Sequence, residues 1–351
     1  MFANNSLFKT ISQESKRIEK KGIFTITPVR VKYTFLNLEQ TKIDYPEIYA
    51  DNGEDFSLNG ILFDSISQPT STSQAKNLNN YIFAKPLFPN ITQVPLINEL
   101  TYIISFPTPS SQDPQFVNLN ESGFYYFQPL NLWNSVHNNA LPNPLVNTTV
   151  TPSQDKTFQQ AELGSTSKNT PQSQEINLGE TFKERSNIKS LQPFEGDIIY
   201  EGRWGQSIRF GSTVKDRKND WSSTGNDGDP ILIIRNGQYN NSEPAWKPTT
   251  ENINLDSGSV YFGTTQKIPL EASSTNYDSY SSNPPTTPKE YASNQIIINS
   301  GRVVINAFED HILITSKKSV NLNAVDSVNI DAPKAVFQTD KIYLGDKDAT
   351  E

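Results

Sequence analysis

Residues 294–351, NQIIINSGRVVINAFEDHILITSKKSVNLNAVDSVNIDAPKAVFQTDKIYLGDKDATE, decide the fold class of this chain. Their apolar residues recur as i, i+2 pairs whose first members are spaced 7, 9, 8, 8, 7 and 7 residues apart. Residues at i and i+2 lie on one face of a β-strand, and the Asn, Asp, Ser and Gly residues between the pairs favour turns. The pairs are Ile296/Ile298, Val303/Ile305, Ile312/Ile314, Val320/Leu322, Val328/Ile330, Ala335/Phe337 and Ile342/Leu344.

A repeat of about eight residues corresponds to a short strand and a turn, which is the unit of a solenoid or β-helix. One such unit cannot bury two large side chains by itself. Either a single chain forms the β-helix, which generally requires longer coils, or several chains wind around a common axis. The short repeat favours intertwined chains with the apolar pairs in their common core. A β-meander of hairpins is a third interpretation, although the regular Asn-Gly or Asp-Gly turns that favour hairpins do not occur there.

The composition of the whole chain also indicates an all-β protein. Hydrophobic residues make up 34% of the 351 residues, and Asn, Ser, Thr, Pro and β-branched residues are common whereas helix formers are scarce. The formal net charge of −8 repels phosphate backbones, so we expect no nucleic-acid partner. The absence of cysteine excludes disulfides and thiolate metal sites.

Short apolar or alternating runs bounded by Pro, Asn or Gly predict strands upstream of the repeat, as in a small barrel or sandwich. A polar segment rich in Gln, Ser, Thr and Asn at about 135–190 separates them, and we expect it to be an insertion. The predicted strands lie within 23–37, 60–66, 81–84, 100–106, 123–127, 196–200, 207–210 and 230–235. The predicted organisation is an arm at 1–22, one discontinuous β-domain over 23–270, a linker at 271–293 and a spike at 294–351.

No sequence motif predicts catalysis, a cofactor or a metal site. The patterns GxGxxG, GxxxxGK, HExxH and GxSxG do not occur, and only His137 and His311 could supply an imidazole. Glu195 and Asp197 could act as an acid–base pair on a glycoside, but we interpret them as charged residues on a barrel rim that faces nearby arginines. We therefore expect no enzymatic activity, no cofactor and no bound metal.

Two other segments could hold an ion. His311 has the opposite parity to Ile312 and Ile314, so we expect an exposed side chain. If this face turned inward in a trimer, three imidazoles near the axis could bind an ion. Asn226-Asp-Gly-Asp229 resembles half of a calcium loop but lacks the bidentate Glu at the right distance, and we predict a turn.

Aromatic and basic residues occur together in the segment 200–221. Aromatic side chains beside a basic groove can stack the bases of a single strand on a barrel. The acidic net charge and the lack of a basic cluster favour packing in the barrel core and between subunits instead. The residues are Tyr200, Trp204, Phe210 and Trp221, with Arg203 and Arg209.

The repeat resembles the trimeric β-helical needle of phage tail spikes and of their type VI secretion counterparts. In those proteins an oligonucleotide/oligosaccharide-binding (OB) barrel precedes the needle. Residues 196–211, GDIIYEGRWGQSIRFG, look like the strand–turn–strand that ends this barrel in baseplate hub proteins of contractile-tailed phages. The segments 85–90, 95–99 and 125–134 are similar to earlier parts of that barrel.

This resemblance implies an OB-like antiparallel barrel with a polar insertion, followed by a C-terminal intertwined triple-stranded β-helix. It also implies a homotrimer in the tail baseplate of a virion, bound to hub and tail tube proteins, that pierces the host envelope. The linker at 271–293 is too short for the lysozyme domain of some family members. The C-terminus lacks the His-x-His tip of many spikes, which implies a separate tip protein or a blunt end.

Two rival functions belong to other classes. A receptor- or glycan-binding tail protein would use aromatic loops as its binding face, and normally places its variable domain at the C-terminus. A polysaccharide-degrading tailspike should have a longer solenoid with carboxylates in a groove, whereas this repeat is short and narrow.

Overall fold

The computed structural model describes residues 26–51, 54–66, 78, 81–88, 90–97, 99–109, 117–130, 137–140, 185–214, 221, 224–239, 246–274 and 285–342. The chain divides into two compact units, residues 1–186 and 187–351. The predicted arm at 1–22 and Leu344 lie outside the described residues, as does most of the 135–190 insertion.

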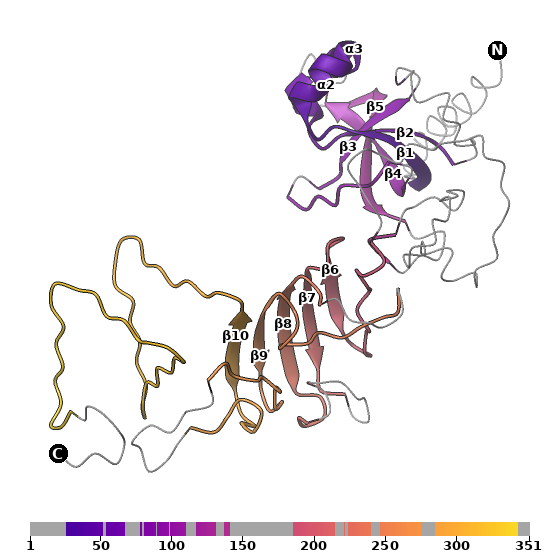
Figure 1. The fold of residues 1–351 in the computed structure, drawn as a ribbon. Helices are drawn as coiled ribbons and strands as arrows, with labels where there is room; N and C mark the ends of the chain where they lie inside the picture. Colours follow the sequence, from indigo (N-terminus) through magenta and orange to yellow (C-terminus); the bar gives the residue numbers. More distant parts are fainter. Residues whose placement is uncertain are drawn as a thin grey trace, which may run out of the picture. The chain divides into compact units, whose positions relative to one another are not determined.

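The first unit contains a closed five-stranded barrel (Figure 1). The strands follow one another around the barrel in the order β1-β2-β3-β5-β4, and β1 pairs with both β2 and β4. All of these pairings are antiparallel except that between β3 and β5, which is parallel. The strands are β1 (Ile26–Thr34), β2 (Ile61–Ser65), β3 (Ile82–Pro86), β4 (Leu100–Pro109) and β5 (Val117–Pro129).

Alternating apolar residues fill the barrel, because successive side chains of a strand point to opposite faces. Val29 and Val31 of β1 are buried there, and the hydroxyl of buried Tyr126 donates a 2.6 Å hydrogen bond to the carbonyl oxygen of Asn59. The core residues are Val29, Val31, Ile61, Phe63, Ala84, Ile103 and Tyr126. All five strands predicted before residue 135 are present, and the prediction of an all-β protein is confirmed.

Two short helices between β1 and β2 were not predicted. Helix α2 (Leu38–Asp44) begins after Asn37, whose side chain accepts a 3.1 Å hydrogen bond from the Gln40 N–H as an N-cap. Helix α3 (Pro46–Asp51) and a 3₁₀ turn (Glu54–Ser57) follow. A second apolar cluster joins this region to β2 and consists of Phe35, Ile48, Leu62 and Leu78.

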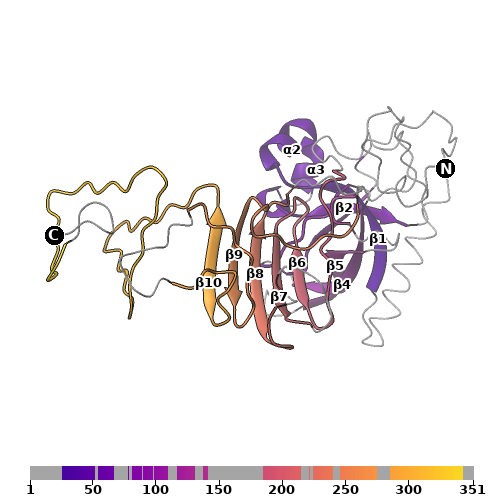
Figure 2. The ribbon, with the colours of Figure 1, turned by 60° about the horizontal axis from the view of Figure 1, so that its bottom comes forward.

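The second unit contains a five-stranded antiparallel sheet in the order β10-β9-β8-β7-β6, visible in both views (Figures 1 and 2). Each strand pairs with the next along the chain, so the sheet is a meander. Strand β9 was not predicted. The strands are β6 (Ile198–Glu201), β7 (Ser207–Ser212), β8 (Pro230–Asn236), β9 (Gly258–Gly263) and β10 (Gln295–Ser300).

This sheet corrects the prediction of one discontinuous β-domain over 23–270. The barrel closes through β1 and β4, and a closed barrel has no free edge to which later strands could add. Strands β6 to β8 therefore pair with one another, and residues 196–211 do not end the barrel. In addition, Ile296 and Ile298, predicted to begin the spike, lie in β10 and pair with β9.

A buried arginine joins one face of this sheet to the loops that cover it. Arg209 in β7 is 0% exposed. Its Nε donates a 2.7 Å hydrogen bond to Glu251, and its two Nη atoms donate to Asp197 and to the carbonyl oxygen of Gln192. The guanidinium also lies 5.3 Å from the ring centre of Trp221. The surrounding core consists of Trp221, Ile231, Ile233, Ile253, Tyr261, Ile268 and Ile297.

Replacing Arg209 by Met should lower the free energy of unfolding of the second unit by roughly 3–5 kcal/mol, because two buried carboxylates would lose their cation. Urea unfolding followed by tryptophan fluorescence measures this loss, since Trp221 contacts Arg209. The exposed Lys267 provides a matched control, and Lys267→Met should change stability by less than about 0.5 kcal/mol. A loss below about 1 kcal/mol for Arg209→Met would show that the ion pairs are not needed.

The first unit should lose stability in mild acid through His137. This side chain is buried, and burial lowers its pKa from 6.5 to about 4. The unfolded chain therefore binds the proton first, so the contribution is fully present above pH 6.5 and is lost as the pH falls toward 4. After allowance for solvent screening the loss amounts to about 2 kcal/mol.

The measurement is a set of unfolding curves between pH 7 and pH 4.5 for the native chain and for His137→Gln. The variant should show a shallower pH dependence than the native chain, because it lacks the titrating group. Parallel curves, or an NMR titration of His137 with a midpoint near its ordinary value, would contradict this assignment.

Candidate functional site

The exposed face of the second sheet carries two complete rows of apolar residues. Cross-strand pairing aligns one residue of each strand in each row, so every strand contributes an i, i+2 pair. Eight of the ten side chains are exposed, and Leu232 and Val260 are half-buried. The rows are Ile198–Phe210–Leu232–Phe262–Ile296 and Tyr200–Ile208–Ile234–Val260–Ile298. We refer to these ten residues as the apolar stripe.

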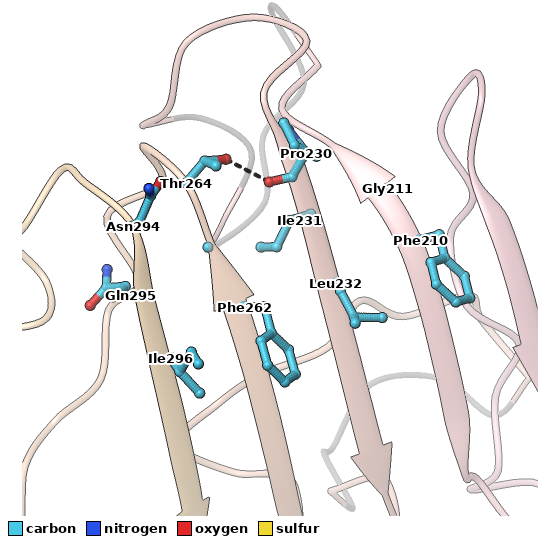
Figure 3. A pocket seen from close by; sticks show the side chains of 11 residues that line it. Phe210, Gly211, Pro230, Ile231, Leu232, Phe262, Thr264, Asn294, Gln295 and Ile296 are labelled. Atoms are coloured by element: carbon cyan, nitrogen blue, oxygen red, sulfur yellow. Dashed lines mark hydrogen bonds between the residues drawn. The ribbon is translucent and has the colours of Figure 1, made fainter.

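One end of the apolar stripe is hollowed into a groove of about 610 Å³ (Figure 3). Phe210, Leu232, Phe262 and Ile296 project into it from four neighbouring strands. At the rim the Thr264 hydroxyl donates a 2.6 Å hydrogen bond to the Pro230 carbonyl oxygen. The groove offers mainly apolar contact, so its chemistry suits packing of apolar side chains.

The covered face of the same sheet carries a complete polar row. A one-sided antiparallel sheet normally has polar side chains toward water and apolar ones toward its core. Here the exposed face carries two apolar rows, and the covered face carries this polar row beside the apolar core, with Glu201 and Asn299 half-buried and the other three residues buried. Asn299 donates through Nδ2 to the Ile253 carbonyl oxygen, and Glu201 accepts a 2.8 Å hydrogen bond from the Leu191 N–H. The row is Glu201–Ser207–Arg235–Ser259–Asn299.

Burial perturbs the carboxylates around this polar row. Desolvation raises the pKa of Asp256 to about 6, although Arg235, 3.9 Å away, acts in the opposite direction. Desolvation also raises the pKa of Glu201, which is opposed by a backbone hydrogen bond from Leu191. These groups are covered by the loops of the unit, so their role is to fix the sheet to those loops.

Beyond β10 the apolar pairs of the repeat are not covered by their own chain. All residues from 301 to 342 are exposed, and none lies in a helix or strand. The described part of one chain thus forms neither a β-helix nor a meander after Ser300. The intertwined β-helix stays a prediction about several chains.

The burial expected for the core residues of the repeat is absent from the single chain. Ile305 and Phe337, both expected in an apolar core, are 70% and 68% exposed, respectively. The physical reason is that a short strand and turn provide no second layer within one chain, so neither side chain has an apolar neighbour to cover it. The same difference between expected burial and observed exposure holds for Ile296, Ile298, Val303, Ile305, Ile312, Ile314, Val320, Leu322, Val328, Ile330, Phe337 and Ile342.

The residues singled out from the sequence have diverse positions. Asp197 binds Arg209, but both belong to the second unit and neither lies in a strand of the barrel or in a loop between its strands. Trp221 is buried in the core of that unit, whereas Tyr200 and Phe210 lie in the apolar stripe and Trp204 is exposed. None of these aromatic residues belongs to the barrel core, because their segment is not part of the barrel.

The two segments considered as ion sites, residues 226–229 and His311, form a turn and an exposed side chain. The Asp229 N–H donates a 3.2 Å hydrogen bond to the Asn226 carbonyl oxygen, and Gly228 between them has φ +82°, which confirms the predicted turn. His311 is exposed beside Asp310. Among the described residues no group of three or more His, Cys, Asp or Glu side chains could hold a metal ion.

Six residues of the apolar stripe were not among the predicted core residues. Each lies in a short apolar or alternating run, such as Pro230–Asn236 or Ser207–Ser212, so the run itself was the available signal. The sequence alone did not show which of the two alternating sets is covered by the loops. The six are Ile198, Ile208, Leu232, Ile234, Val260 and Phe262. For Tyr200 and Phe210 the sequence predicted packing in the barrel core and between subunits.

Within the described residues, no helix is long and apolar enough to cross a membrane. Comparison of the chain with models of protein families, with curated proteins and with solved structures gave no match.

Proposed function

We propose that this chain is a structural subunit of the central spike of a contractile-tail baseplate, which links the hub to a needle that pierces the host envelope. One observation carries the proposal. The i, i+2 apolar pairs from Val303 to Ile330 remain exposed in a single chain, although their spacing is that of a β-helix core. Three intertwined chains would bury them on a common axis, as in the needles that the repeat resembles.

The topology of the barrel supports the same proposal. The order β1-β2-β3-β5-β4 with parallel β3 and β5 is the strand order of an OB barrel, the fold expected before such a needle. Along this chain the helices come between β1 and β2, and the strands of a second sheet come between the barrel and the repeat. We assign the barrel the role of an adaptor to the hub and tail tube proteins.

The proposed partners follow from this position in a virion. The subunit is a homotrimer that contacts the hub above and the host envelope transiently. A non-enzymatic role agrees with the lack of catalytic motifs in the sequence. The acidic net charge disfavours nucleic acid as a partner.

The first test of the proposal is the mass of the full-length protein in solution. Static light scattering at micromolar concentration should give three times the chain mass of 39.4 kDa. Removal of residues 301–351, which leaves β10 in its sheet, should weaken the trimer because the paired apolar residues of the repeat are lost. A full-length chain that runs as a monomer would overturn the proposal.

The register of the repeat gives a second test. Ile314→Asp and Leu322→Asp should abolish the trimer, because three carboxylates would meet in an apolar axis and even one unpaired buried charge costs several kcal/mol. Asn321→Asp changes the opposite face and should alter stability by less than about 0.5 kcal/mol. Trimer content after mild heating, measured by ultracentrifugation, distinguishes them. Equal damage from all three variants would show that the inward face is misassigned.

A further inference from the structure

We propose that the apolar stripe of the second sheet is itself a self-association surface, occupied by the same stripe of two further copies of this chain. Three sheets would then enclose a common apolar interior that begins at β6, about a hundred residues before the repeat. The number of copies rests on the proposed function, whereas the surface rests on the sheet alone.

The stripe requires a cover because its polarity is the reverse of a water-facing sheet. At its edges Tyr200 and Ile296 are each 65% exposed, and no charged residue interrupts either row. Contiguous apolar patches of this kind mark interaction surfaces in soluble proteins. The loops of the unit already cover the opposite face, so the stripe must be covered by another chain or segment.

The occupant is identified by continuity with the repeat. Each strand of the sheet contributes one i, i+2 apolar pair, which is also the pattern of the repeat, and Ile296/Ile298 belongs to both. The stripe and the repeat thus share one pair, and the repeat continues directly along the chain from the end of β10. Chains that associate through the repeat would bring their β10 strands together, and with them the stripes that start there.

The width of the stripe favours three copies. It is only two side chains wide on strands of four to seven residues, and Asn236 and Ser300 on the same face are polar and exposed. A six-residue strand is about 20 Å long. If three such faces form the sides of a triangular prism, the midline of each face lies about 6 Å from the central axis. This matches half of the roughly 10 Å spacing of packed sheets, so side chains from the midline would fill the interior.

The test uses the full-length chain with a charge in the middle of the stripe. Ile234→Lys should weaken trimer formation by about tenfold or more, because three ammonium groups would be buried together. Asn236→Lys, on the same strand and face but outside the stripe, is the matched control and should change the association constant by less than about threefold. Both side chains are exposed in one chain, so tryptophan fluorescence should show an intact fold in both variants.

Chemical cross-linking provides a measurement that does not depend on the stability of the variants. The chain contains no cysteine, so Ile208→Cys introduces a single thiol in the stripe. A short bismaleimide should link two copies through Cys at this position, and should not link them in Asn236→Cys.

The outcomes separate this inference from the proposed function. If the native chain is trimeric and Ile314→Asp dissociates it, but Ile234→Lys does not and Ile208→Cys gives no cross-link, the stripe is not the interface and the spike proposal stands. Capture of another part of the same chain by the stripe would give a monomer and would overturn the inference. Loss of the trimer in Ile234→Lys with an intact fold, together with cross-linking at position 208, would support it.

Discussion

The organisation of the second unit depends on the alternation of side chains along the strands of its sheet. Successive side chains of a strand point to opposite faces, so a strand that buries Arg235 must expose Ile234 and Asn236. Five strands obey this constraint in one register, which places a polar row under the loops and ten apolar side chains on the other face. Within a single chain the loops cover only the face that carries the polar row, and the apolar stripe is left uncovered.

The buried ionic layer determines which face the loops cover. Arg209 holds Asp197 and Glu251 from two different loops, and the Gln192 carbonyl oxygen completes its contacts. A shift of one residue in β7 would expose this guanidinium and bury Ile208 and Phe210 among carboxylates. The ion pairs of Arg209 that fix the loops on one face therefore keep the apolar stripe exposed on the other face. The register of β7 thus matters both for the stability of one chain and for the proposed association between chains.

The two units divide the proposed work of the subunit. The barrel is closed around its apolar core, helices pack on β2, and the whole lies within one compact unit. The second sheet ends in β10, from which the chain continues directly into the repeat. In the proposed spike subunit, the barrel would bind the hub, and other copies would cover the apolar pairs.

The sequence by itself determined that the chain is all-β, because β-branched and turn-forming residues dominate, and it placed eight of the ten strands from short apolar or alternating runs. The helices after Asn37 are too short to show a helical repeat of apolar residues, whereas β9 was missed although it is as long as strands that were predicted. The sequence also placed the apolar pairs of the repeat, but a pattern of pairs cannot say which chain covers them, and Ile305 and Phe337 are exposed in one chain. Only the tertiary structure decided that the barrel closes before the insertion, because pairing of β1 with β4 is a long-range contact. Likewise, alternation defines two faces of every strand, and only the loops packed around Arg209 decide which of them faces water.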